Sequence, residues 1–275
     1  MRVDAHAHFW QLGDHGCTWP PPELNPIYRD FLPANWRVEA DRAGIDCAIA
    51  VQSQACAADT DWLLQLAAHE PRIGAVVGWV DLAAPDAPAR IAALAAHPKL
   101  RGLRPMLQDL PADDWILSPS LAPALAAMER HGLRFDALVR PPHLPFLLRF
   151  AERRPELPII IDHAAKPAIA RHELEPWRTW ITRLAALPRV CCKLSGLVTE
   201  AGEHWARDDL VPYVGHLFTA FGSQRLLWGS DWPVVNLACN HARWFALAGE
   251  LVGDDDKVRA AVFGGNAARV YGLQT

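Results

Sequence analysis

The sequence predicts a single-domain α/β protein of the (β/α)8 class, the TIM barrel. Eight short apolar runs alternate with longer segments rich in Ala and Leu over 275 residues, a length at which such barrels form one domain. Chemically reactive side chains also follow several of these runs, at the ends where barrel strands carry functional residues. An open doubly wound sheet is disfavoured because no Gly-rich phosphate turn follows the first run. We therefore expect one barrel domain over residues 1–275.

The eight apolar runs are predicted to be strands because they are short and bounded by turn residues. They cover residues 2–10, 47–52, 73–81, 100–107, 133–139, 157–162, 189–196 and 225–231. Helices are predicted over residues 59–70, 85–97, 119–132, 143–154, 173–187, 206–221 and 241–252, with one or two more between 254 and 271.

Capping residues and one irregular segment complete this pattern. Asp59 and Ser118 are candidate helix N-caps, and Gly132 is a candidate helix stop. Residues 11–34 form a long irregular segment after the first strand. Because barrel active sites lie on that face, we expect this segment to form part of a pocket wall.

Composition and charge narrow the possible partners. The net charge is −4, so we expect no nucleic-acid partner, since such proteins carry a basic surface. No apolar run approaches the ~18 residues of a membrane span, and the opening residues lack the apolar segment of a secretory signal. The six cysteines form no C-x-x-C pair, which favours free thiols and a cytoplasmic location. A homo-oligomer is compatible with this composition.

Two histidines, His6 and His8, lie in the first predicted strand, in the run VDAHAHFW. Because side chains alternate along a strand, both imidazoles should point to the same side, about 7 Å apart. The same alternation predicts that Asp4 points inward with them. Buried polar groups need hydrogen-bond partners or a ligand. A lone H-x-H pattern is more often structural, so other strand ends must supply further support.

Three further strand ends carry candidate site residues: IIIDHAAKP with Asp162, His163 and Lys166, GLRPM with Arg104, and LLWGSDWP with Asp231. Alternation lets only one of Asp162 and His163 point inward, and we expect it to be His163, with Asp162 structural.

Imidazoles and a carboxylate suit one divalent metal, with zinc as the expected ion and one position left for water. The predicted ligands and catalytic residues are His6, His8, His163 and Asp231. Asp231 would also act as the general base for water, although an aspartate in this position can simply cap the following turn.

The runs DAHAHFW, DHAAKP and LLWGSDWPV together resemble the amidohydrolase superfamily. They are similar to its amidohydrolase 2 branch, which contains fuconolactonase- and rhamnonolactonase-like sugar lactonases and the 2-pyrone-4,6-dicarboxylate lactonase. GWVDL, GLRPM and KLSGLVTEA extend the resemblance, in order, through nearly the whole chain. The resemblance implies a barrel with its active centre at His6, His8, His163 and Asp231, which opens a sugar-acid lactone by attack of water on the carbonyl.

Some expectations within this resemblance stay open. Binuclear members carry a lysine or glutamate after strand four and a histidine after strand five. Arg104 and Asp136 lie there instead, so a two-metal centre is not expected. One zinc-like ion and a metal-free mechanism are both open. The alternative reaction is that of a mononuclear metal-dependent decarboxylase, and Asp231 argues against a barrel that only binds a sugar acid. The predicted substrate contacts are Arg104, Lys166, Trp79 and Trp232.

Overall fold

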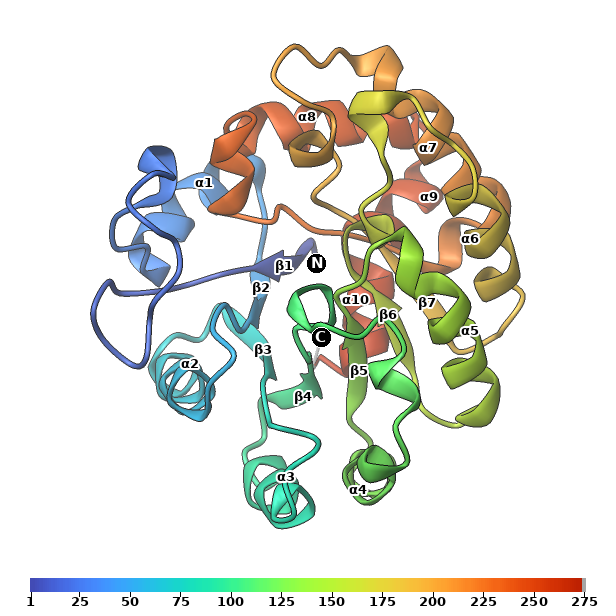
Figure 1. The fold of residues 1–275 in the computed structure, drawn as a ribbon. Coiled ribbons are helices and arrows are strands. Elements are labelled where there is room, and N and C mark those ends of the chain that lie inside the picture. The colour runs from blue at the N-terminus through green and yellow to red at the C-terminus, as the bar shows by residue number, and fades with distance from the viewer. Residues whose placement is uncertain (274–275) are drawn as a thin grey trace.

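The computed structural model describes residues 1–273, and in this part of the chain eight parallel strands form a barrel enclosed by helices (Figure 1). Neighbouring strands follow chain order from β1 to β8. A bridge between Ala7 and Trp232 brings the first strand beside the segment after the last. The predicted single-domain TIM barrel is confirmed. Residues 274–275 of the predicted domain lie outside the described part.

The strands occupy the eight predicted runs but are shorter than those runs. Several strands end before the predicted site residues, so that His8, His163 and Asp231 lie in the turns that follow β1, β6 and β8. The strands are β1 Val3–Ala7, β2 Cys47–Val51, β3 Ile73–Gly78, β4 Leu100–Leu103, β5 Arg134–Ala137, β6 Ile159–Ile161, β7 Val190–Leu194 and β8 Leu226–Trp228.

The α-helices cover the outside of the barrel (Figure 1). They are α1 Pro33–Ala43, α2 Ala57–His69, α3 Ala87–Ala95, α4 Ala122–Arg130, α5 Leu144–Arg153, α6 Trp177–Ala185, α7 Arg207–Phe221, α8 His241–Val252, α9 Asp256–Ala260 and α10 Asn266–Tyr271.

The sequence analysis missed α1, which begins at the end of the segment predicted to be irregular. Pro33 occupies the first turn and Gly44, at φ 63°, ends the helix, an arrangement typical of helix boundaries. Asp59 is not the N-cap of α2. That helix begins at Ala57, and the Asp59 carboxylate instead accepts hydrogen bonds from backbone N–H groups of the preceding loop.

Apolar side chains fill both faces of the strands. Along β2, Ile49 and Val51 belong to the cluster inside the barrel, whereas Ala48 and Ala50 pack with the helix layer. The six cysteines are free thiols. Among the described residues, no helix has the length and apolar character needed to cross a membrane.

A β-bulge in β1 reverses the predicted orientation of Asp4. Between two paired positions β1 advances three residues while β2 advances two, so β1 contains one extra residue. Asp4 therefore faces the helix layer, where its Oδ2 accepts hydrogen bonds from Trp36 Nε1 at 3.2 Å and Ser230 Oγ at 2.6 Å. The prediction that Asp4 shares a side with His6 and His8 is wrong, because simple alternation assumes an unbroken strand.

Candidate active site

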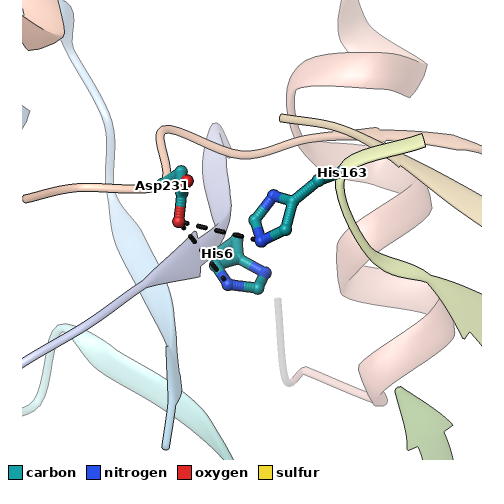
Figure 2. A group of neighbouring side chains, drawn as sticks. All are labelled: His6, His163 and Asp231. Atoms are coloured by element: carbon teal, nitrogen blue, oxygen red, sulfur yellow. Dashed lines mark ion pairs between the residues drawn. The ribbon is translucent and has the colours of Figure 1, made fainter. Parts of the chain in front are cut away.

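Four predicted site residues converge at the carboxyl end of the barrel. His6, His163 and Asp231 each place a donor atom within 4.8 Å of the others, and Figure 2 shows the three side chains facing one another. Asp231 Oδ1 lies 3.8 Å from Nε2 of both histidines and 3.5 Å from His8 Nε2. All four residues are buried. The first, sixth and eighth strands thus contribute to one centre.

Hydrogen bonding determines which nitrogen of His8 faces this centre. His8 Nδ1 lies 2.8 Å from the carbonyl oxygen of Val51, which can only accept, so Nδ1 carries the proton. In the neutral ring, Nε2 then presents a lone pair. It lies 3.1 Å from His6 Nε2. Such close nitrogen atoms require a proton or a cation between them.

The donor set fits a divalent metal ion. Asp231 Oδ1 is buried and has no hydrogen-bond partner among the described residues. Imidazole nitrogen and carboxylate oxygen are common zinc ligands. Ser195 Oγ lies 2.9 Å from His163 Nδ1, so the other ring nitrogen remains directed at Asp231, as polar partners commonly direct metal-binding histidines.

Burial and neighbouring charges set the protonation of the centre. Burial lowers the pKa of His163 to about 4. Burial, aided by the charge of Lys193, lowers the pKa of His6 well below its ordinary value. Burial alone would raise the pKa of Asp231, but His163, His8 and His6 together hold it below its ordinary range. At neutral pH His6 and His163 are thus neutral and Asp231 is ionised, the forms that bind metal ions.

An unusual turn after β6 directs both Asp162 and His163 to the interior. Residues 163–166 all have positive φ angles, between 49° and 61°, which is unfavourable for residues other than glycine. Asp162 Oδ2 consequently lies 3.4 Å from Arg104 Nη1 inside the barrel. The prediction that only one of Asp162 and His163 points inward is wrong, because β6 ends at Ile161 and strand alternation stops there.

Neighbouring elements hold this turn in place. Trp177 Nε1, on α6, donates a hydrogen bond of 2.6 Å to the carbonyl oxygen of Ala164. Gly196 has φ 63°, and a Cβ atom there would lie 2.6 Å from His163 Nδ1. Sequence reasoning missed these contacts and the role of Ser195. The run KLSGLVTEA, which contains Ser195 and Gly196, contributed to the family resemblance, but its sequence did not indicate a contact with His163.

A fully buried charged cluster lies beneath the centre. Lys193 Nζ, on β7, is 2.6 Å from Asp136 Oδ2, 2.9 Å from Asp162 Oδ1 and 3.1 Å from His6 Nδ1. Tyr271 on α10 donates a hydrogen bond of 2.7 Å to Asp136. The sequence analysis missed this cluster. A single lysine inside an apolar strand was the available signal, since such a lysine needs buried counter-charges.

A cavity of about 390 Å³ opens on the centre. Gln54 fastens the segment 11–34 to its edge. Its Oε1 accepts hydrogen bonds from the backbone nitrogens of Thr18 and Trp19, both at 3.1 Å, and its Nε2 donates to the Trp19 carbonyl at 2.8 Å. The segment thereby becomes part of the cavity wall. The lining residues include His8, Thr18, Trp19, Gln54, Arg104, Met106, Gln108, Leu138, His163, Lys166, Asp231 and Val234.

A family model described as amidohydrolase matches residues 3–273. The chain belongs to the amidohydrolase family. It is 50% identical to an L-fucono-1,5-lactonase of Burkholderia ambifaria, over 98% of this chain and 95% of that protein. It is 37% identical to an L-fucono-1,5-lactonase of Burkholderia multivorans, over 99% of this chain and 96% of the relative. A crystal structure of a Burkholderia multivorans amidohydrolase with bound zinc has a TM-score of 0.93, with 36% identity over 100% of both chains.

In this amidohydrolase, two of the four predicted substrate contacts line the cavity. Arg104 does so with a buried Nε that has no hydrogen-bond partner in the described part of the chain. Lys166 also lines it, with Nζ 3.8 Å from Glu200 Oε1. Of the residues described, those lining the cavity include Trp19 but neither Trp79 nor Trp232.

Proposed function

We propose that this amidohydrolase opens a sugar-acid lactone by attack of water on the ring carbonyl, with L-fucono-1,5-lactone as the substrate to test first. The observation that carries this proposal is the unpartnered, ionised Asp231 oxygen facing the imidazoles of three histidines, His6, His8 and His163. It faces them beside a cavity of about 390 Å³, which suits a small molecule. The two relatives at 50% and 37% identity bear lactonase names, which supports the reaction class.

The chain's own residues have distinct roles in this proposal. Asp231 orients the attacking water, accepts its proton and returns it to the departing ring oxygen. Arg104 donates its free Nε–H to a substrate oxygen, and the charge of this guanidinium stabilises negative charge that develops on the carbonyl. Lys166 donates to a hydroxyl group. We assign the aromatic contact to Trp19 in place of Trp79 and Trp232, because Trp19 lines the cavity.

His6, His163 and Asp231, with His8 beside them, would hold one divalent metal, and we propose zinc. When bound, such an ion lowers the pKa of water to about 7 and polarises a carbonyl. An aspartate with a pKa below its ordinary range is a weak base, which favours the metal-assisted version over the metal-free one. The decarboxylase alternative has less support, because the relatives at 50% and 37% identity are named as lactonases. A cytoplasmic location and a homo-oligomer stay predictions, the first supported by the free thiols.

A screen of aldonolactones tests the proposal. Acid release from L-fucono-1,5-lactone and from other lactones is followed with a pH indicator, above the uncatalysed rate. We expect rapid turnover of at least one lactone, loss of turnover after treatment with a chelator, and recovery with zinc. Absence of acid release from every lactone by folded, zinc-loaded protein would overturn the lactonase assignment. Release of carbon dioxide from an aromatic carboxylate would favour the decarboxylase.

A further inference from the structure

The proposed mechanism leaves one buried charge unused, the ammonium group of Lys193. Its Nζ donates a hydrogen bond of 2.6 Å to Asp136 Oδ2 and lies 3.1 Å from His6 Nδ1. It also forms an ion pair of 2.9 Å with Asp162 Oδ1. Lys193 is completely buried, so no solvent competes for these contacts. The ammonium thus acts directly on a histidine of the active site.

Lys193 and Asp162 make opposite demands on the same nitrogen of His6. Lys193 Nζ can only donate to Nδ1, whereas Asp162 Oδ1, 3.5 Å from Nδ1, can only accept from it. Asp162 Oδ1 also lies 2.9 Å from Lys193 Nζ, so Lys193 contacts both His6 and the carboxylate that competes for it. His6 Nδ1 can therefore bond to Lys193 without a proton, or to Asp162 with one, but not to both.

The proton on His6 decides what the other ring nitrogen offers. A neutral imidazole has one N–H and one lone pair. When Nδ1 accepts from Lys193, Nε2 carries the proton and donates to the lone pair of His8 Nε2, 3.1 Å away. When Nδ1 donates to Asp162, Nε2 has the lone pair that a metal needs.

The hydrogen-bond distances favour the first arrangement. A continuous series of hydrogen bonds then runs from Lys193 through His6 and His8 to the carbonyl oxygen of Val51, with lengths of 3.1, 3.1 and 2.8 Å. The opposing donor to His6 Nε2 is Arg104 Nη1, at the longer distance of 3.4 Å. The contact of His6 with Asp162 is also longer, at 3.5 Å.

We propose that Lys193 is a positioning residue that holds His6 in the tautomer unable to bind a metal, so that metal loading moves the His6 hydrogen bond from Lys193 to Asp162. Lys193 therefore weakens the metal affinity of the site. This inference rests on the metal site proposed above, and it does not depend on which substrate the enzyme uses.

The tautomer of His6 can be read by NMR in the wild-type protein labelled with ¹⁵N-histidine, with His6→Asn to assign the resonances. Without metal, we expect the protonated nitrogen of His6 to be Nε2. After addition of Zn²⁺ it should be Nδ1. A metal-free His6 that already carries its proton on Nδ1, or a tautomer unchanged by Zn²⁺, would overturn the proposal.

Metal affinity gives a second test that uses no lactone. The paired variant Lys193→Met/Asp136→Asn removes one charge of each sign and leaves Asp162 as the remaining partner of His6 Nδ1. We expect it to bind Zn²⁺ about tenfold more tightly, or better, in competition with a chelating dye, a size typical of changes next to metal ligands.

Tyr271→Phe is the matched control, because it removes a hydrogen bond to Asp136 without touching His6. Its Zn²⁺ affinity should stay within about twofold of wild type, because Lys193 keeps its contacts with His6 and Asp162 in this variant. Unchanged or weaker Zn²⁺ binding by a folded paired variant contradicts the proposal. If that variant does not fold, the NMR measurement on wild-type protein decides. Neither the NMR measurement nor the Zn²⁺ affinity measurement uses a lactone, so both remain interpretable if the lactonase assignment is wrong.

Discussion

Two buried atoms without hydrogen-bond partners define the chemistry of the site. Asp231 Oδ1 and Arg104 Nε carry opposite charge and belong to residues that line the same cavity. An unsatisfied buried polar group costs about 1–3 kcal/mol. These two groups therefore lower the free energy of unfolding, and a bound ion, water or substrate that contacts them offsets this loss. These atoms therefore indicate where a ligand binds more directly than exposed polar residues do.

Replacement of Asp231 tests this interpretation. Asp231→Asn keeps the size of the side chain but removes its charge and its ability to accept a proton. We expect kcat for lactone hydrolysis to fall about 10²–10⁴-fold, the usual contribution of a general base, with little change in Tm. Asp208→Asn, at a side chain that is 89% exposed, is the control and should retain wild-type rates. A similar kcat for the two variants would exclude Asp231 as the base.

At the level of elements, the sequence predicted the positions of strands and helices, which depend on local pattern. It missed the bulge in β1 and the turn after β6, which involve contacts with neighbouring elements. All eight strands and the helices from α2 to α8 lie at or near their predicted positions, because apolar periodicity is local. His6, in the bulged part of β1, packs closely against Gly229, which follows β8. A Cβ atom at Gly229 would lie 2.7 Å from the Cβ atom of His6. The left-handed turn after β6 likewise depends on contacts from α6 and from Gly196. No pattern within either segment encodes these contacts.

Gly229→Ala tests the contact that accommodates His6. The added methyl group should displace His6, reduce lactone turnover and lower the free energy of unfolding by about 1–3 kcal/mol, as overpacking does. Gly215→Ala is the control, since nothing lies within 4 Å of that position on α7. Better helix propensity should stabilise this variant by up to about 1 kcal/mol. Urea unfolding compares the two. Equal stability of both variants would show that β8 does not restrict His6.

Trp177→Phe tests the support of the left-handed turn. It removes the 2.6 Å hydrogen bond to the Ala164 carbonyl and keeps the apolar packing. The loss should lower the free energy of unfolding by about 1–3 kcal/mol and reduce kcat, because His163 lies in this turn. Trp180→Phe, on the same helix, is the control and should retain kcat. Wild-type kcat in Trp177→Phe would mean that the turn holds His163 without help from α6.

Across the whole molecule, a polar layer separates the active centre from the apolar interior of the barrel. His6, Asp136 and Lys193 lie on β1, β5 and β7, Asp162 follows β6, and Tyr271 connects them to the last helix. The sequence analysis predicted the barrel, and it predicted that His6, His8, His163 and Asp231 meet at one end of it. The sequence analysis did not predict this layer, because its members are distant in sequence and no local pattern indicates that they contact one another.

The depressed pKa of His163 predicts how stability depends on pH. The pKa is about 4 in the folded protein against an ordinary value of 6.5, so the unfolded chain binds a proton first as the pH falls. This contribution is fully present above pH 6.5 and is lost between 6.5 and about 4. In the presence of a chelator, we expect it to lower the free energy of unfolding by about 2 kcal/mol between pH 7 and pH 5.

His163→Gln isolates this effect from the other buried histidines. Urea unfolding of the variant at the same two pH values should show a smaller loss of stability than wild type shows. An identical pH dependence would mean that the pKa of His163 in the folded protein is close to its ordinary value.

The way in which Gln54 holds the irregular segment has an evolutionary consequence. Gln54 and the contacts of His15 with Asp59 and Trp62 attach this wall, whereas the reactive groups lie on the barrel strands or directly after them. Mutations along residues 11–34 can therefore alter which ring is admitted while the hydrolytic machinery stays intact. Related proteins with this fold can therefore diverge in substrate specificity while they keep the same catalytic residues.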